Sequence, residues 1–236
     1  MSRVYAHSGD TLFRMNPLTL SPMQIGAMSG ITGQLLDLAV DKNDRIVGAS
    51  RTELYTINST TGAATLLRTL DAGAQGFTSL SFIPAPSPSD PDILVAANDA
   101  GDVFQINEAN GTATKIGNYG MHDGMQVKSS GDLFGVRGYG IFATVDIGTG
   151  TMDYLARVDP ANNYKATPLA QSTGHDKIFG LGFWGGKIYG FVDNGFEAAS
   201  GTMIQIDSVT GAATTLSMGP QRWFGAGVTT EAPIIQ

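Results

Sequence analysis

Three histidines are the side chains of this sequence best suited to acid–base chemistry or metal binding. His7, His122 and His175 are its only imidazoles, and Asp123 and Asp176 follow the last two directly. Imidazole titrates near neutral pH and is the commonest metal ligand in proteins. If the three histidines meet, they can hold a divalent metal ion that acidifies a bound water molecule. This predicted site depends on how the fold places three separate loops.

Other polar and aromatic side chains complete the set of candidates. Arg137 and Tyr139 join the histidines and the two aspartates as candidates for catalysis. The candidates for ligand binding are Arg51, Gln126, Glu197, Arg222 and Trp223. No HExxH, GxSxG or Walker motif accompanies them. Gly180, Gly182 and Gly185 match the dinucleotide-binding fingerprint letter for letter, but they lie in a strand that enters a turn instead of preceding a helix.

The composition excludes several classes of function. The chain has no cysteine, which removes thiol catalysis, thiolate metal sites and disulfides. Its net charge is −7 and its 14 basic residues are dispersed, so we expect no nucleic-acid partner. No apolar run is long enough to span a membrane. The first residues do not form a signal peptide, which predicts a cytoplasmic protein, or an extracellular or periplasmic one if a leader has been removed.

Five repeats must position these residues. Each contains an alternating apolar segment that ends in Asn or Asp, a turn and a second strand, the pattern of a β-hairpin. These segments are 12–16, 54–58, 103–107, 142–146 and 203–207. Upstream of each, small residues alternate with apolar ones, at 37–40, 79–82, 124–127, 180–183 and 225–228. With one more short strand between them, each repeat has four strands and a period of about 47 residues, typical of a propeller blade.

The two ends of the chain predict how the ring closes. The chain begins with the second strand of a blade, and it ends with an inner strand, 225–228, that no hairpin follows. Residues 223–236 and 1–30 together complete one blade and leave no free edge at the seam. The sequence therefore predicts an all-β single domain over 1–236, a five-bladed β-propeller of four-stranded blades closed by its C-terminal strand. The small side of the inner strands, which includes Asp37 and Gly227, is expected to face a narrow axis.

The repeats resemble those of a superfamily of bacterial β-propellers built from a Leu-Tyr-x-Ile-Asp-x-x-Thr-Gly unit. The fullest copies are 54–62 and 203–211. Members of this superfamily have unrelated functions, so the resemblance implies the fold alone. In blade number and size the chain is also similar to the five-bladed lectin tachylectin. That lectin has tryptophan-bearing sugar sites, whereas Trp184 and Trp223 do not recur in every blade of this chain.

Loop lengths indicate which face of the ring carries function. The face where the inner strands begin, which we call the top face, is predicted to carry the two largest insertions, 156–177 and 192–202, and all three histidines, with Arg137, Tyr139 and Trp223 near them. Long loops on one face of a rigid scaffold often form binding sites. The first hypothesis is a non-enzymatic propeller that binds a small molecule, a glycan or a protein at the top mouth of the channel. The alternative is a lyase or hydrolase that uses the histidines, with or without a divalent metal. The sequence leaves this choice and the oligomeric state open.

Overall fold

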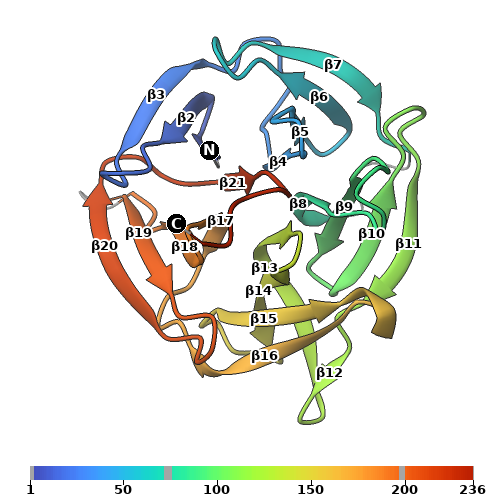
Figure 1. Ribbon diagram of the computed structural model, residues 1–236, viewed down its shortest axis with the longest axis vertical. Helices are drawn as coiled ribbons and strands as arrows, with labels where there is room; N and C mark the ends of the chain where they lie inside the picture. Colours follow the sequence, from blue (N-terminus) through green and yellow to red (C-terminus); the bar gives the residue numbers. More distant parts are fainter. Residues whose placement is uncertain (1–2, 72–75, 197–199, 236) are drawn as a thin grey trace.

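Five antiparallel sheets surround a common centre, so the predicted five-bladed β-propeller is confirmed (Figure 1). The computed structural model describes residues 3–71, 76–196 and 200–235. These residues form 21 strands and one short helix, Pro160–Asn162. No helix in this part of the chain is long and apolar enough to cross a membrane.

The blades follow one another along the chain, and the strands of each blade run in order from the inner strand outwards. The closing blade consists of β21 (Gly225–Val228), β1 (Val4–Ser8), β2 (Thr11–Met15) and β3 (Pro22–Ala27). Blade two consists of β4 (Asp37–Val40), β5 (Ile46–Ala49), β6 (Glu53–Ile57) and β7 (Ala64–Thr69). Blade three consists of β8 (Phe77–Ile83), β9 (Ile93–Asn98), β10 (Asp102–Ile106) and β11 (Ala113–Asn118). Blade four contains β12 (Met121–His122), β13 (Met125–Val136), β14 (Gly140–Ile147), β15 (Tyr154–Asp159) and β16 (Lys165–Ser172). Blade five consists of β17 (Ile178–Trp184), β18 (Lys187–Asp193), β19 (Gly201–Ile206) and β20 (Ala213–Gly219).

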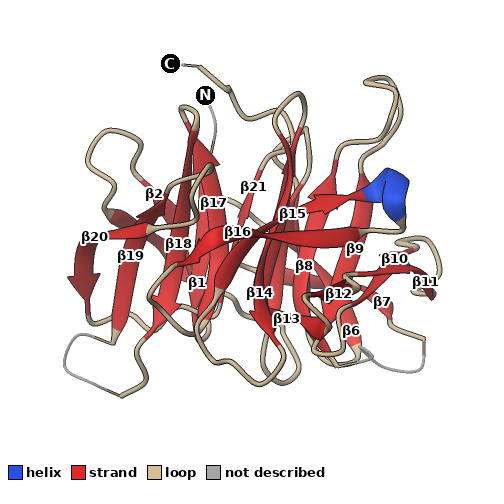
Figure 2. Cartoon of the chain, turned by 90° about the horizontal axis from the view of Figure 1, so that it is seen from below, coloured by secondary structure: helices blue, strands red, loops and turns tan. Residues whose placement is uncertain are grey.

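The C-terminal strand closes the ring, as the sequence predicts. β21 pairs with β1 in an antiparallel ladder in which Val4 lies opposite Val228 and His7 opposite Gly225. Both chain ends consequently lie on one face, at the upper edge of Figure 2. This seam is non-covalent, so the closing blade exists only while both ends of the chain are paired.

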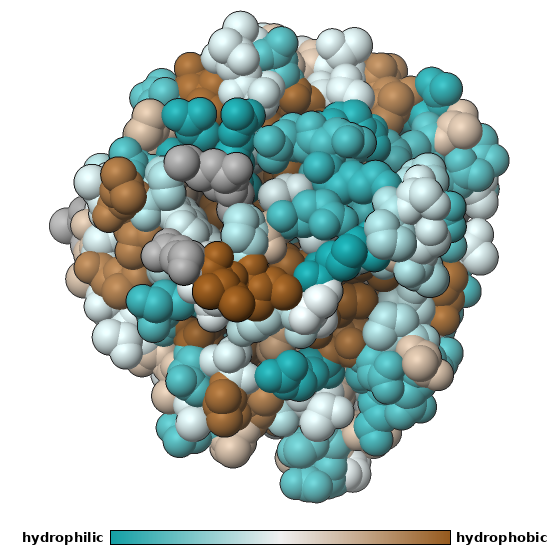
Figure 3. All heavy atoms as spheres, viewed as in Figure 1, coloured by the Kyte–Doolittle hydropathy of each residue, from teal (hydrophilic) through white to brown (hydrophobic). Residues whose placement is uncertain are grey.

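The segment that follows β21 crosses the face on which the chain ends. Thr229 Oγ1 donates to the carbonyl of Asp41 at 2.9 Å, and Thr230 Oγ1 donates to Asp92 at 2.6 Å. Three different blades are therefore joined at this end of the ring. Figure 3 shows the same face, where polar residues cover most of the surface. This is the bottom face, opposite the face where the inner strands begin.

The fourth blade differs from the sequence prediction. The segment 124–127, expected to be its inner strand, lies in a hairpin with β12 that projects from the ring (Figure 1). The inner strand is instead the second half of β13, where Leu133 pairs with Ala143 of β14. The prediction failed because 124–127 has the same alternation of small and apolar residues as the true inner strands.

This shift moves the later strands of blade four inwards by one position. The segment 142–146, predicted as a third strand, belongs to the second strand, β14. Residues 156–177, predicted to be a top-face insertion, contain most of β15, the short helix and the outer strand β16. The prediction of one large irregular loop at 156–177 is therefore wrong.

The inner strands pack closely against one another. A Cβ atom added to Gly180 would lie 2.7 Å from the Cβ of Ala226 in the closing blade. One added to Gly227 would lie 2.8 Å from the carbonyl oxygen of Leu38 in blade two. The small residues of these strands therefore face the inner strand of the next blade, whereas the sequence predicted that they would face a narrow axis. Close contact between blades is the reason that they are small.

Candidate functional site

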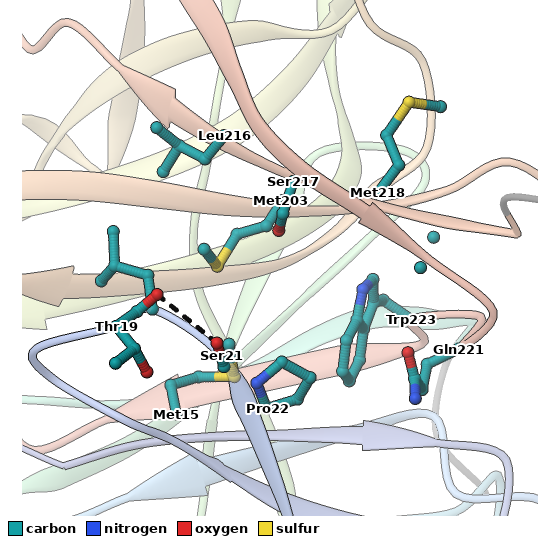
Figure 4. A pocket seen from close by; sticks show the side chains of 13 residues that line it. Met15, Thr19, Ser21, Pro22, Met203, Leu216, Ser217, Met218, Gln221 and Trp223 are labelled. Atoms are coloured by element: carbon teal, nitrogen blue, oxygen red, sulfur yellow. Dashed lines mark hydrogen bonds between the residues drawn. The ribbon is translucent and has the colours of Figure 1, made fainter.

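A groove with a volume of ≈ 430 Å³ opens at the outer rim, between blade five and the closing blade (Figure 4). Its walls come from β19, β20 and the turn that joins β2 to β3. The apolar lining residues are Met15, Leu20, Met203, Leu216, Met218 and Trp223. The side chains that offer hydrogen bonds are Thr19, Ser21, Ser217 and Gln221. The groove therefore presents a largely apolar wall with a few neutral polar groups.

Trp223 forms a rigid part of the groove. Its indole is only 4% exposed, and it contacts the rings of Phe13 and Phe191 edge to face, each at a centroid distance of 5.5 Å. Aromatic pairs in this geometry stabilise each other beyond their buried area. The three methionines beside it have flexible, polarisable side chains that adapt to the shape of a bound group.

Arg222 is committed to a neighbouring ion pair. Its Nε donates to one oxygen of the Asp193 carboxylate at 2.7 Å and its Nη2 donates to the other at 2.5 Å. Its guanidinium also lies over the rings of Phe196 and Phe224. The charge of Arg222 is thus neutralised by Asp193. Among the described residues, none that lines the groove is charged.

His7 lies at the top end of the inner strands and is fully buried. Its Nδ1 is 3.3 Å from the carbonyl oxygen of Gly9, and its Nε2 has no hydrogen-bond partner among the described residues. Burial lowers the pKa of His7 to about 4, because the charged imidazolium would lose its hydration. The ring is consequently neutral at physiological pH.

Two buried carboxyl groups lie at the same end of the ring. Asp37 Oδ2 accepts from the Leu80 amide at 2.7 Å, and Asp132 Oδ2 accepts from the Leu181 amide at 2.5 Å. Each aspartate thus connects its own blade to the next one. Burial raises the pKa of both, and the Asp132 charge raises that of Asp37 further. Both shifts favour the neutral acid, so the pair tends to retain a proton.

The sequence prediction included Asp37 among the axial residues but missed Asp132. A signal for it is present, because Asp132-Leu133 repeats the Asp37-Leu38 dipeptide at the start of an inner strand. In both dipeptides the carboxylate also accepts from the amide of its own leucine. The misplaced inner strand of blade four hid this correspondence.

The other two histidines belong to different elements from His7. His122 is part of the projecting hairpin, where its Nε2 is 3.6 Å from Asp123 Oδ2. His175 precedes β17, and its carbonyl oxygen accepts from the Asp153 amide at 2.8 Å. In the part of the chain that the structure describes, no three His, Cys, Asp or Glu side chains are grouped so as to hold a metal ion. The expected three-histidine metal site is therefore not formed by this arrangement.

Asp153 is a titratable group that the sequence prediction missed. Its carboxylate accepts from the Ile178 amide at 2.7 Å and so connects blade four to blade five. Burial raises the pKa of Asp153 to about 7, and the charges of Asp146 and Asp176 contribute to this shift. Asp176, a predicted catalytic residue, therefore contributes to the raised pKa of the buried Asp153.

Arg137 and Tyr139 lie on the bottom face, not on the top face as predicted. Arg137 Nε donates to Glu231 at 2.6 Å, which holds the C-terminal segment. The ring of Tyr139 packs against that of Phe183 at 4.4 Å. Their position follows from the strand shift in blade four, because the turn after the true inner strand reaches the bottom face.

The remaining candidates belong to different parts of the ring. Gln126 lies in the projecting hairpin, where its Nε2 donates to the carbonyl of Val127 at 3.1 Å. Arg51 is exposed between β5 and β6. Glu197 lies outside the described residues, as does part of the predicted insertion 192–202. Trp223 is the predicted ligand-binding residue that lines the groove.

Comparison with known proteins supports the fold alone. No family model matches the chain, and no curated protein matches it. Among solved structures, a chain from a study of the de novo evolutionary emergence of a symmetrical protein shares 15% identity over all of both chains, with a TM-score of 0.55. A chain from a nidogen/laminin complex shares 10% identity over all of both chains, with a TM-score of 0.56. A protein of unknown function from Bacteroides caccae shares 10% identity over 96% of this chain and 98% of its own, with a TM-score of 0.50.

Proposed function

We propose that this protein is a non-enzymatic binding propeller whose site is the groove between blade five and the closing blade. One observation carries the proposal: a groove of ≈ 430 Å³ is lined by methionines, Leu216 and Trp223, with no charged side chain among its described lining residues. Pockets that bind small ligands typically have volumes of about 300–1,000 Å³ and mainly apolar walls. The ligand is therefore an uncharged and largely apolar group.

This location replaces the top mouth of the channel that the sequence favoured. At the top end of the inner strands, His7, Asp37 and Asp132 are buried, and the two carboxyl groups accept hydrogen bonds from backbone amides. These groups stabilise the ring and are not presented to a ligand. Glycan binding by stacking is not favoured either, because the indole of Trp223 is only 4% exposed and shows no open face to a sugar.

The enzymatic alternative has one observation in its favour. Asp153 has a pKa of about 7, which suits a group that gives and takes protons near neutral pH. Its side chain is fully buried, however. A substrate would reach Asp153 only if blades four and five separated, so binding in the open groove is the function that the geometry supports better.

Binding of the uncharged apolar dye Nile red tests the proposal. We expect the dye to fluoresce on the native protein, and we expect Leu216→Asp or Met218→Asp to weaken its binding by about tenfold or more. In either variant a carboxylate must be desolvated in a groove without counter-charges. Both residues are exposed, Met218 by 62%, so the substitutions should leave the fold intact.

The matched control is Leu66→Asp on β7, the outer strand of blade two. Leu66 is 53% exposed and lies outside the groove. We expect this variant to bind Nile red as the native protein does. Equal loss of binding in the control, or undiminished binding in both groove variants, would show that the dye binds elsewhere and would refute the proposal.

A further inference from the structure

We propose that the partner of this groove is an extended, uncharged peptide segment that pairs with the free edge of β20 and inserts an apolar side chain beside Trp223. The inference rests on the proposed function and names the occupant of the same site. β20 is the outermost strand of blade five, and no strand among the described residues pairs with its outer edge. Figure 1 shows it on the rim of the ring.

β20 differs from the other outer strands in having no protection of its edge. Charged residues and prolines on an edge strand hinder pairing with another chain. The protecting residues of the other four outer strands are Pro22 in β3, Arg68 in β7, Lys115 in β11, and Lys165 and Pro168 in β16. The sequence of β20, Ala-Thr-Thr-Leu-Ser-Met-Gly, contains no charged residue and no proline, and its five central residues are exposed.

The lack of charged side chains in β20 and in the described lining of the groove favours an uncharged segment as the partner. The chain carries a net charge of −7, yet neither β20 nor the described lining of the groove contains a charged side chain. A charged side chain entering this region would lose its hydration and gain no counter-charge, which makes its entry unfavourable. An uncharged strand avoids this penalty along its whole length.

The groove and the free edge belong to one surface. Leu216 and Met218 are residues of β20 and also line the groove, and Figure 4 shows this strand above Met203 and Trp223. In a strand laid along β20, every second side chain would point to the groove side. Main-chain hydrogen bonds would supply affinity, and the pocket would select an apolar side chain, as in other cases of strand addition.

A phage-displayed library of linear heptapeptides, selected on the full chain, tests this proposal, since its members match the 7 residues of β20. We expect the enriched peptides to lack Asp, Glu, Lys and Arg and to alternate apolar with small polar residues. Synthetic copies of these peptides should slow hydrogen exchange of the β20 amides, because a paired edge no longer exposes them to water.

The decisive variant is Thr215→Lys. Thr215 lies opposite Ile204 as Lys115 lies opposite Phe104 in blade three, so the variant gives β20 the edge lysine that β11 already has. We expect it to weaken peptide binding by about tenfold or more while Nile red binding stays unchanged. Thr65→Lys, at an exposed position on β7, is the control and should change neither.

Three results would overturn the edge-pairing proposal: no enrichment, enrichment of charged peptides, or equal peptide binding by the Thr215→Lys variant. In each of these cases, Nile red binding to the native protein would leave the proposed groove function standing. If the native protein does not bind Nile red, both the groove function and the edge-pairing proposal are refuted. A concentration-dependent dimer in sedimentation, abolished by Thr215→Lys, would replace the peptide with a second copy of this chain.

Discussion

The buried pair of Asp37 and Asp132 should make the stability of the ring depend on pH, and Asp37→Asn should remove much of that dependence. In the folded chain, burial and the charge of Asp132 raise the pKa of Asp37, so the fold favours its neutral form. An asparagine has nearly the shape of the protonated acid, and its amide can donate to Asp132 while its oxygen accepts from the Leu80 amide. The substitution therefore fixes the neutral state that the fold selects.

The sign follows from the direction of the shift. The folded-state pKa of Asp37 is raised above its ordinary value by burial and by Asp132. The stability that this proton contributes is fully present below the unfolded-state pKa of about 3.9 and is lost as the pH rises through the folded-state pKa. Within that window the native protein loses about 1.4 kcal/mol per pH unit for each proton released.

The difference in unfolding free energy between the native protein and the Asp37→Asn variant is expected to change sign as the pH rises. At about pH 4 the Asp37→Asn variant should be less stable by about 1 kcal/mol, because the Leu38 amide loses its hydrogen bond. As the pH rises, the difference should shrink and then reverse. Asp37→Ala is the contrasting variant. It leaves Asp132 and the Leu80 amide without their partner, so it should be destabilised by about 3–5 kcal/mol.

Urea unfolding at a series of pH values from about 4 to about 9, followed by tryptophan fluorescence, measures these differences. The quantity to compare is the difference in unfolding free energy between variant and native protein, since contributions from His7 and Asp153 are present in both. A difference that stays constant over the whole range would refute the assignment of a shared proton to this pair.

Three further predictions concern the ring itself. Burial lowers the pKa of His7 to about 4. The native protein should therefore lose up to about 3 kcal/mol of stability as the pH falls from about 6.5 to about 4. A folded His7→Asn variant should not show this loss in the same urea series. Gly227→Leu should destabilise the fold by about 3 kcal/mol or more, because even its Cβ would lie 2.8 Å from the Leu38 carbonyl oxygen. Thermal melting measures this loss. The control is Gly150→Ala, which should cost about 1 kcal/mol or less, because Gly150 has a negative φ and its added Cβ would have a nearest contact of 3.2 Å. Removal of residues 223–236 deletes β21 and should give an aggregated or unfolded chain, since the buried side chains of one strand contribute a large part of a total stability of about 5–15 kcal/mol; a truncated protein that melts cooperatively would contradict closure by this strand.

The sequence predicted the hairpins well because each one is specified locally. In blade two, Asn58 Oδ1 accepts from the amides of Thr60 and Thr61, and Gly62 adopts a φ of 82°. Asp207 does the same for Val209 and Thr210 in blade five. Such turns need only four or five adjacent residues, so their sequence pattern is sufficient evidence for them.

Blade four was mispredicted because strand order is not a local property. The segment 124–127 has the composition of an inner strand, yet the interaction that places an inner strand comes from the next blade. In blade four that interaction is the hydrogen bond from the Leu181 amide to Asp132, which joins residues 49 positions apart in the sequence. Because the later strands of blade four were assigned one position too far outwards, Arg137 and Tyr139 were predicted to lie on the wrong face.

The groove was beyond sequence analysis for a related reason. Met15 and Met203 line it together, although they come from opposite ends of the chain and meet only because the ring closes. Trp223 was a candidate because it was predicted to lie on the top face near the histidines, and nothing in the sequence indicated that methionines would surround it. The histidines drew attention to the top face through their chemistry, whereas the uncharged groove contains no residue type that signals a site.

Ring closure and the groove depend on the same stretch of chain. Trp223 lines the groove and is followed within two residues by β21, which pairs with β1. The groove walls belong to β19 and β20 on one side and to the β2–β3 region on the other, so the groove keeps its shape only while the seam is closed. A segment bound there would contact both blades that flank the seam and would favour the closed ring over any state in which β21 has separated. Binding at the proposed site would therefore stabilise the seam, which is the one place where the ring is closed by pairing between the two ends of the chain, and where added contacts between blades would have the largest effect on the integrity of the ring.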